Sequence, residues 1–281
     1  MIRLAVRCRP ELADRVLAEL IELAPGGIEE AEGDGYVELA VYGAPGELPE
    51  LPDLEAAAAD GLIEVTTTEI PDDWADRWRD FHQPTEVGDG RLVVQPSWLG
   101  DGAGPRPGLA VTVDPGRAFG TGAHATTRLC LELLLEAADR GEAEGPLADL
   151  GTGSGVLAIV AAKLGFGPVT GVDSEPAALD AARANAAANG VEIELRRLDL
   201  RRDPPPAVPT IVANLTAPLL EEVAARIAEP PRMMICSGLL AGEAGEAAAV
   251  LAAAGLAVAE RRVSGDWAAL RLRRGSAGRR G

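Results

Sequence analysis

Residues 147–173, LADLGTGSGVLAIVAAKLGFGPVTGVD, determine the fold that the rest of the chain follows. The first four residues have the apolar character of a buried parallel strand, interrupted only by Asp149. A turn with three glycines comes next and leads into an apolar helix that ends at Gly165. A second apolar strand follows and ends at Asp173. The stretch therefore predicts a strand, turn, helix and strand with a nucleoside site at the carboxyl edge of a parallel sheet.

The spacing of the glycines discriminates between two classes of cofactor. Gly151, Gly153 and Gly155 follow the pattern G-x-G-x-G, whereas dinucleotide sites use G-x-G-x-x-G. Val156 occupies the position of the third glycine that would pack the helix under a pyrophosphate. S-adenosylmethionine has no pyrophosphate, so it fits this turn better, with Asp173 accepting hydrogen bonds from the ribose. A glycine turn that binds no ligand is the alternative.

The composition is that of a globular protein with unevenly distributed charge. The 281 residues are 47% hydrophobic and carry a net charge of −18, and the length allows one or two domains. Residues 1–70 hold 16 acidic residues and 4 arginines, a net charge of −12, compared with −6 for the remainder. This imbalance disfavours nucleic acid and favours a basic partner, although general solubility explains it equally well.

Targeting and metal signals are weak in this sequence. No apolar run approaches the ~18 residues of a membrane span, and the first residues lack the apolar core of a signal peptide. Cys8, Cys130 and Cys236 are scattered, without metal or disulfide spacing. We therefore expect a cytoplasmic protein with no membrane contact and no metal site.

Residues 1–70 have the pattern of a small α+β domain. Alternating or β-branched runs predict strands at 2–7, 28–31, 36–42 and 62–70, and helical spacing predicts helices at 10–23 and 51–60. The order β-α-β-β-α-β suggests a ferredoxin-like domain that serves in recognition. Residues 71–84 are expected to form a linker helix whose aromatic residues, Trp74, Trp78 and Phe81, pack in a core.

Residues 85–281 have the pattern of a doubly wound α/β domain. We predict strands at 109–113, 147–150, 168–172, 193–198, 210–213, 232–236, 256–263 and 267–273. Helices are predicted at 128–138, 156–165, 175–189, 218–227 and 243–254. Ser174 is expected to cap the helix that follows it. Five α/β units followed by an antiparallel pair predict a seven-stranded sheet.

The segment DPGRAFGTGAHATT, residues 114–127, is too long and too particular for a plain turn, and such loops usually carry function. His124 is a candidate general base, but a role in ordering the loop by a hydrogen bond is the favoured interpretation. Phe119 has two interpretations of equal weight, contact with the cofactor or acceptor amine and packing within the loop.

One family combines all these features in the same order. The loop 114–127, the turn 149–155, Asp173 and the stretch 214–219 together resemble the bacterial ribosomal protein L11 methyltransferase family, PrmA. The family's loop reads D-P-G-x-A-F-G-T-G-x-H-x-T-T, and every fixed letter is present. The chain departs from the family after Asn214, where L-T-A stands in place of the usual I-L-A or L-Y-A. Residues 1–70 match the family only in pattern.

The resemblance implies a class I methyltransferase fold with a Rossmann-like sheet and S-adenosylmethionine as methyl donor. It implies lysine ε-amines and an N-terminal α-amine as acceptors. By position, Thr127, Gly151, Gly153, Asp173 and Asn214 would bind the cofactor, and Asn214 would also be the catalytic residue. The acidic first domain would bind the substrate, a basic large-subunit ribosomal protein. We expect a monomer that makes no direct contact with nucleic acid.

Three other functions are compatible with parts of the sequence. A methyltransferase for adenine or cytosine amino groups usually carries two prolines and an aromatic ring after the fourth strand, and Leu215-Thr216-Ala217 has neither. The lysine methyltransferase of the electron-transfer flavoprotein β subunit is a related enzyme. A non-catalytic ribosome-assembly factor would bind only the cofactor and a basic partner, and the intact Gly151, Asp173 and Asn214 argue against it.

Overall fold

The computed structural model of the chain describes residues 2–23, 28–33, 35–43, 62–69, 84–99, 108–114 and 124–275. These residues divide between two compact units, those up to 69 in the first and those from 84 onward in the second. The predicted helix at 51–60, the aromatic residues of the predicted linker helix and Phe119 lie outside the described residues. Among the helices within the described ranges, none is long and apolar enough to cross a membrane.

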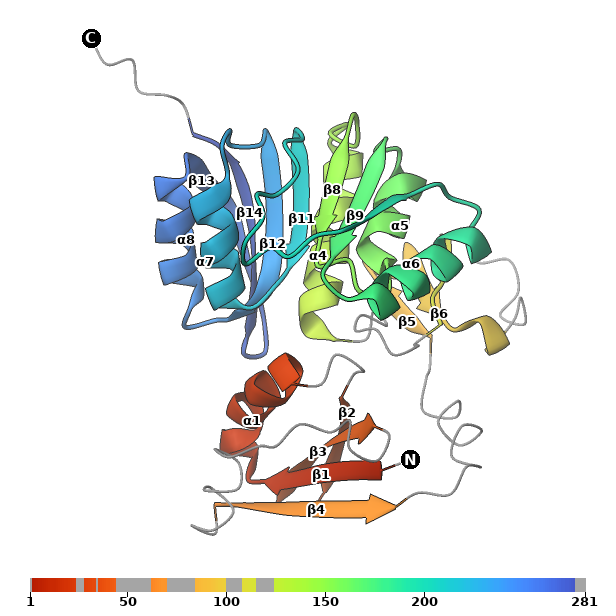
Figure 1. Cartoon of the computed structure of the whole chain (residues 1–281), viewed down its shortest axis with the longest axis vertical. Helices are drawn as coiled ribbons and strands as arrows, with labels where there is room; N and C mark the ends of the chain where they lie inside the picture. The colour runs from red at the N-terminus through yellow and green to blue at the C-terminus, as the bar shows by residue number, and fades with distance from the viewer. Residues whose placement is uncertain are drawn as a thin grey trace. The chain divides into compact units, whose positions relative to one another are not determined.

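The first unit contains a four-stranded antiparallel sheet with a helix packed on it. The strands are β1 (Ile2–Cys8), β2 (Glu29–Gly33), β3 (Tyr36–Gly43) and β4 (Ile63–Glu69), and their spatial order is β2-β3-β1-β4 (Figure 1). The helix α1 (Pro10–Leu23) contacts β1 and β3, and its Val16, Leu17 and Leu20 are buried. This order suits the β-α-β-β-α-β pattern. The ferredoxin-like assignment stays a prediction, because its second helix falls outside the described residues.

The second unit is built on a seven-stranded sheet whose strand order reverses near its centre. In space the strands run β10-β9-β8-β11-β12-β14-β13. Their bounds are β8 (Leu147–Leu150), β9 (Val169–Asp173), β10 (Glu194–Arg197), β11 (Thr210–Asn214), β12 (Met233–Leu240), β13 (Leu256–Ser264) and β14 (Trp267–Arg274). The first five strands in this order are parallel, and β14 is antiparallel to β12 and β13. The predicted seven-stranded sheet with its antiparallel pair is confirmed.

Helices cover both faces of this sheet. They are α4 (Ala125–Asp139), α5 (Val156–Leu164), α6 (Pro176–Ala188), α7 (Ala217–Arg226) and α8 (Ala244–Ala253). The crossovers from β8 to β9 and from β11 to β12 run in opposite directions along the sheet, so right-handed connections direct their helices to opposite faces. The helix α5 packs between α4 and α6, and α7 packs beside α8 (Figure 1).

A small three-stranded sheet adds a layer beside α4 and α5. Its strands are β5 (Thr85–Val87), β6 (Leu92–Gln95) and β7 (Leu109–Thr112), with β5 antiparallel and β7 parallel to β6. The helix α4 contacts β12 and β14 of the large sheet and also β5. Leu131, Leu133 and Leu134 of α4 are consequently fully buried. Burial of each such side chain contributes about 1.5–3 kcal/mol to the stability of the fold.

Local differences from the prediction have physical reasons. Ser174 does not cap α6: the helix begins after Glu175, and the carboxylate of Asp173 accepts the backbone N–H of Glu175 at 3.0 Å. The strand β12 continues beyond the predicted end at Cys236, because a bulge between Cys236 and Leu239 absorbs a register shift against β14. The strands β5 and β6 were not predicted.

Candidate functional site

The predicted site residues converge at the carboxyl edge of three neighbouring strands. β8 lies between β9 and β11, and the glycine turn follows its last residue, Leu150. Asp173 ends β9 on one side of this turn, and Asn214 ends β11 on the other. The strand order reverses between β8 and β11. In open α/β sheets, ligands bind in the crevice at such a reversal.

The glycine turn is held against β9 by its own backbone. The N–H groups of Gly151 and Thr152 both donate to the carbonyl of Val172 at 2.9 Å. Gly151 and Gly153 have φ of 69° and 52°, a left-handed conformation that side chains other than glycine's rarely adopt. A Cβ on Gly151 would also lie 2.6 Å from the side chain of Leu215, so the turn and the end of β11 are in close contact. The glycines are thus required by conformation and by packing.

The third glycine has a packing role of its own. Gly155 precedes the first residue of α5 with φ of 82°, and a Cβ there would lie 3.1 Å from the Cβ of Ala182 on α6. It therefore allows the start of α5 to approach α6. Because Val156 begins α5, the turn has no glycine at the position where a dinucleotide fingerprint requires one.

Asp173 joins the turn to the start of α6 and keeps acceptor capacity. One carboxylate oxygen accepts the N–H of Gly153 at 3.0 Å, and the other accepts that of Glu175 at 3.0 Å. A carboxylate has about four lone-pair sites, so two remain for further donors such as a pair of ribose hydroxyls. The carboxylate is half-buried, so a ligand can reach it.

Asn214 and Thr127 are brought together from distant parts of the chain. The Asn214 amide donates to the Thr127 hydroxyl at 3.2 Å, across 87 residues of sequence. Thr127 lies in the first turn of α4 and is buried, whereas Asn214 is half-buried. No described residue donates a hydrogen bond to the side-chain oxygen of Asn214. That oxygen is therefore available to a ligand at the crevice.

Gly238 determines where the segment after Asn214 lies. The N–H of Leu215 donates to the carbonyl of Ser237 at 3.0 Å, and Gly238 has φ of 86°. A Cβ on Gly238 would lie 2.4 Å from the carbonyl oxygen of Leu215. The backbone after Asn214 is thus packed between the glycine turn and the bulge of β12.

Asp149 is a residue whose role the sequence reasoning missed. It is fully buried in β8, and one carboxylate oxygen accepts the hydroxyl of Thr152 at 2.7 Å and the N–H of Ala158 at 3.2 Å. The other oxygen has no hydrogen-bond partner among the described residues. Burial raises the pKa of Asp149 to about 7, and repulsion from Asp173 acts in the same direction. The sequence feature that could have indicated this role is the single acidic residue in an otherwise apolar strand.

His124 is the N-cap residue of α4, and its contacts do not suit a general base. Its Nδ1 lies 2.8 Å from the Thr126 hydroxyl, and its ring meets that of Trp267 edge-on at 4.9 Å. Burial, and then the charge of Arg128, lowers the pKa of His124 to about 4. A histidine that is neutral and engaged in this way suits ordering of the helix start better than proton abstraction.

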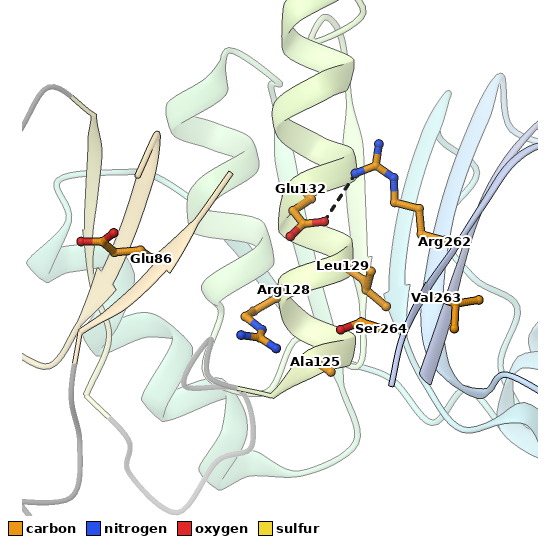
Figure 2. A pocket seen from close by; sticks show the side chains of 8 residues that line it. All are labelled: Glu86, Ala125, Arg128, Leu129, Glu132, Arg262, Val263 and Ser264. Carbon is orange, nitrogen blue, oxygen red and sulfur yellow. Dashed lines mark hydrogen bonds and ion pairs between the residues drawn. The ribbon is translucent and has the colours of Figure 1, made fainter. Parts of the chain in front are cut away.

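Two hollows of about 400 Å³ lie on the second unit. One begins next to Asp173, at the carboxyl ends of β9 and β10, and Ser174, Leu198 and Asp199 are among the residues that line it. The other lies between α4, β5 and β13, where Arg262 reaches toward Glu132 at 3.4 Å (Figure 2). None of the predicted site residues lines either of these two hollows.

Comparison with known proteins decides the family. A family model for ribosomal protein L11 methyltransferase (PrmA) matches residues 50–275. The chain belongs to this family. Membership confirms the prediction of an S-adenosylmethionine-dependent protein methyltransferase with a class I fold.

Individual members of the L11 methyltransferase family are similar over most of the chain. The protein of that name from Pelotomaculum thermopropionicum is 42% identical over 216 residues, 74% of this chain and 68% of the relative. That from Geobacter metallireducens is 40% identical over 210 residues, 73% and 68% of the two chains. The match to the Symbiobacterium thermophilum protein has 43% identity but covers only 60% of this chain and 55% of the relative.

A solved structure shares the fold. The crystal structure of the ribosomal protein L11 methylase from Lactobacillus delbrueckii subsp. bulgaricus matches with a TM-score of 0.61 and 28% identity. The match covers 69% of this chain and all of the other. The matched residues of the family model begin at 50, so most of the first unit lies outside them. The L11 methyltransferase family is therefore established for the second unit, and the role of the first is a separate question.

Proposed function

We propose that this protein transfers methyl groups from S-adenosylmethionine to lysine ε-amines, and to the N-terminal α-amine, of ribosomal protein L11. The observation that carries the proposal is the convergence of the glycine turn, Asp173 and Asn214 on one crevice in a member of this family. The relatives named above are L11 methyltransferases, which supports the choice of substrate.

The residues at the crevice fit the donor chemically. The two lone-pair sites left on Asp173 suit the ribose hydroxyls, and the half-buried Gly151 and Gly153 belong to the turn that Asp173 contacts. The hollow next to Asp173 is lined mainly by charged and polar side chains, with Leu198 as its apolar residue, and we propose that the base of the donor lies toward it. When bound, the donor supplies a methyl group on a sulfonium that needs no further activation. Thr127 and Asn214 would hold its other end.

The acceptor amine must lose its proton before it can attack. An exposed lysine has a pKa of about 10.4, and only the neutral amine carries a lone pair. Removing the amine from water lowers that pKa. We propose that the side-chain oxygen of Asn214 accepts an N–H of the neutral amine and so directs its lone pair. Nδ1 of His124 is engaged with Thr126, and we propose bulk water as the proton acceptor.

Substrate recognition is assigned to the first unit on grounds of charge. Residues 1–70 carry a net charge of −12, and an acidic surface attracts a basic protein. Several lysines of one bound substrate can then reach a single crevice in turn, because tethering raises their local concentration. The boundaries 1–70, 71–84 and 85–281 belong to the same proposal. The monomeric state and the absence of nucleic-acid contact stay predictions.

Mass spectrometry of purified L11 incubated with the protein and labelled S-adenosylmethionine tests the proposal. Methyl groups on lysines and on the N-terminus are the expected result. The electron-transfer flavoprotein β subunit and an adenine-containing oligonucleotide serve as rival substrates. Label on a rival and none on L11 would overturn the choice of substrate.

A second measurement separates an enzyme from a binding factor. Asp173→Ala should weaken donor binding by about 1.5–3 kcal/mol, the usual loss for a hydrogen bond to a charged group. It should lower methylation of L11 in parallel at subsaturating donor. Donor binding by the wild type without methylation of any substrate would favour the assembly factor instead.

A further inference from the structure

Asn185 joins two segments that the proposed site depends on. It lies in the second half of α6, and only 4% of the residue is exposed. Its Nδ2 donates to the carbonyl of Ser154 in the glycine turn at 2.9 Å. Its Oδ1 accepts the N–H of Asp114 at 3.0 Å. One side chain therefore bridges the turn after β8 and the first residue of the loop 114–127.

Asp114 is held from its other side as well. Its carboxylate accepts the N–H of Ser97 at 2.7 Å and the hydroxyl of Ser97 at 2.8 Å. A chain of hydrogen bonds thus runs from Ser97 through Asp114 and Asn185 to Ser154. The amide of Asn185 links this chain of hydrogen bonds to the glycine turn.

The bridge requires a group that donates and accepts at once. Asparagine is the shortest side chain with an amide donor and a carbonyl acceptor at one position. Ser154 is fully buried, so loss of this donor would remove a hydrogen bond from its carbonyl at a place that water does not reach. The turn is also intrinsically pliable, because Gly153 and Gly155 flank Ser154.

We propose that Asn185 is a positioning residue for the donor site: it holds the glycine turn in its donor-binding conformation and fixes the turn relative to Asp114. The inference rests on the proposed function, since it assumes that the turn binds S-adenosylmethionine. Asn185 touches no reacting atom, and its effect on binding passes through Ser154.

Asn189 offers a matched control one helical turn later. Its Oδ1 accepts the N–H of Thr112 at 2.9 Å, and its Nδ2 donates to the Thr112 carbonyl. Its Nδ2 also donates to the backbone carbonyl of Asn185 at 2.8 Å. Asn189 therefore ties α6 to β7, two residues before Asp114, but makes no hydrogen bond to the glycine turn among the described residues. If Asn185 had only a structural role, substitutions of Asn185 and of Asn189 would affect donor binding equally.

The test compares Asn185→Asp with Asn189→Asp in the full chain. Each change removes the amide donor and keeps the acceptor. We measure the Kd for S-adenosylhomocysteine by calorimetry and the thermal midpoint of unfolding for both variants. Asn185→Asp should weaken binding by about tenfold, because the glycine turn loses the hydrogen bond that holds it against α6. Asn189→Asp should bind within about twofold of the wild type, and both midpoints should fall.

Steady-state kinetics separate an effect on the donor site from a loss of stability, because a loss of stability alone would not raise the KM for the donor. The KM for the donor should rise for Asn185→Asp, while kcat at saturating donor stays within about threefold of the wild type. Asn185→Ala, which adds no charge, is measured in parallel in case the aspartate variant does not fold. Equal donor affinity in wild type and both Asn185 variants would overturn the inference and leave the proposed function intact. A wild type that binds no donor would overturn both.

Discussion

Asp149 and His124 are buried ionisable groups beside the same crevice, and they make stability depend on pH in opposite directions. Burial raises the pKa of Asp149 to about 7, so the folded protein holds this proton more tightly than the unfolded chain. Burial lowers the pKa of His124 to about 4, so the folded protein binds that proton less tightly. The first effect destabilises the fold as pH rises, and the second destabilises it as pH falls.

Asp149→Asn should remove the first effect. In the wild type, the free energy of unfolding loses a few kcal/mol as pH rises from the ordinary aspartate pKa of 3.8 to about 7. Asparagine does not ionise and can still accept the N–H of Ala158. Urea titrations should therefore show the variant gaining stability relative to wild type between pH 5 and pH 8. If the two proteins differed in free energy of unfolding by the same amount at pH 5 and at pH 8, the raised pKa of Asp149 would be contradicted.

His124→Asn should separate proton abstraction from helix capping. Asparagine is a favourable N-cap residue, so α4 is expected to form in the variant. Its kcat should stay within about threefold of the wild type. The wild type should lose stability as pH falls from 6.5 toward 4, and the variant should lose less. Urea titrations at pH 4.5 and pH 7 measure this difference. A loss of more than 100-fold in kcat with normal stability would identify His124 as the base.

At the scale of elements, the bulge in β12 positions the end of β11. Gly238→Ala would force a side chain into a left-handed conformation and against the backbone of Leu215. We expect it to displace Asn214, to lower kcat/KM for L11 by at least tenfold, and to cost about 1–3 kcal/mol of stability. Steady-state kinetics and urea titration measure the two effects.

Gly242→Ala is the control for the bulge. Gly242 follows the same strand, and a Cβ there would meet no atom within 4 Å. This variant should keep the activity of the wild type. If Gly238→Ala were as active as Gly242→Ala, the backbone after Asn214 would not need its present position.

The elements that the sequence predicted are those with a continuous local pattern. The strands β8, β9 and β11 are short apolar runs, and Asp173 and Asn214 stand at the strand ends that a parallel sheet brings together. The strands β5 and β6 have three and four residues, too few for a period, and β7, the second partner of β6, is not adjacent to it in sequence. Their pairing therefore had no local signal.

The contacts within the site were harder to predict than its members. Asp149 reaches the N–H of Ala158 nine residues away, and Asn185 joins Ser154 to Asp114 across three separate segments. The N-cap residue of α6 is Glu175 and not Ser174, and its backbone N–H donates to Asp173. Such bonds depend on how elements pack, so a residue pattern cannot specify them.

At the scale of the whole molecule, the uneven charge predicts a division of labour that salt can reveal. The electrostatic attraction between residues 1–70 and a basic substrate should weaken as the screening length drops from ~10 Å at 0.1 M salt to ~3 Å at 1 M. The KM for intact L11 should therefore rise with salt. The KM for a short peptide with a single lysine, which carries little positive charge, should change less.

Charge variants of the full chain locate this effect. Three exposed acids of the first unit are changed to lysine together, namely Glu11, Glu30 and Glu64. The control changes three exposed acids of the second unit to lysine, namely Glu221, Glu229 and Glu246. Both triple variants alter the net charge by the same amount, so a general effect of charge on solubility or encounter cancels in the comparison.

The first triple variant should raise the KM for intact L11 several-fold more than the control does, because substrate encounter is steered by the local field and not by net charge alone. Its Kd for S-adenosylhomocysteine, measured by calorimetry, should equal that of the control, because the donor site lies in the second unit. Its kcat should also be retained, since Asn214 is untouched. If both variants raised the KM for L11 equally, recognition would not reside in residues 1–70, and the acidic first unit would serve only solubility.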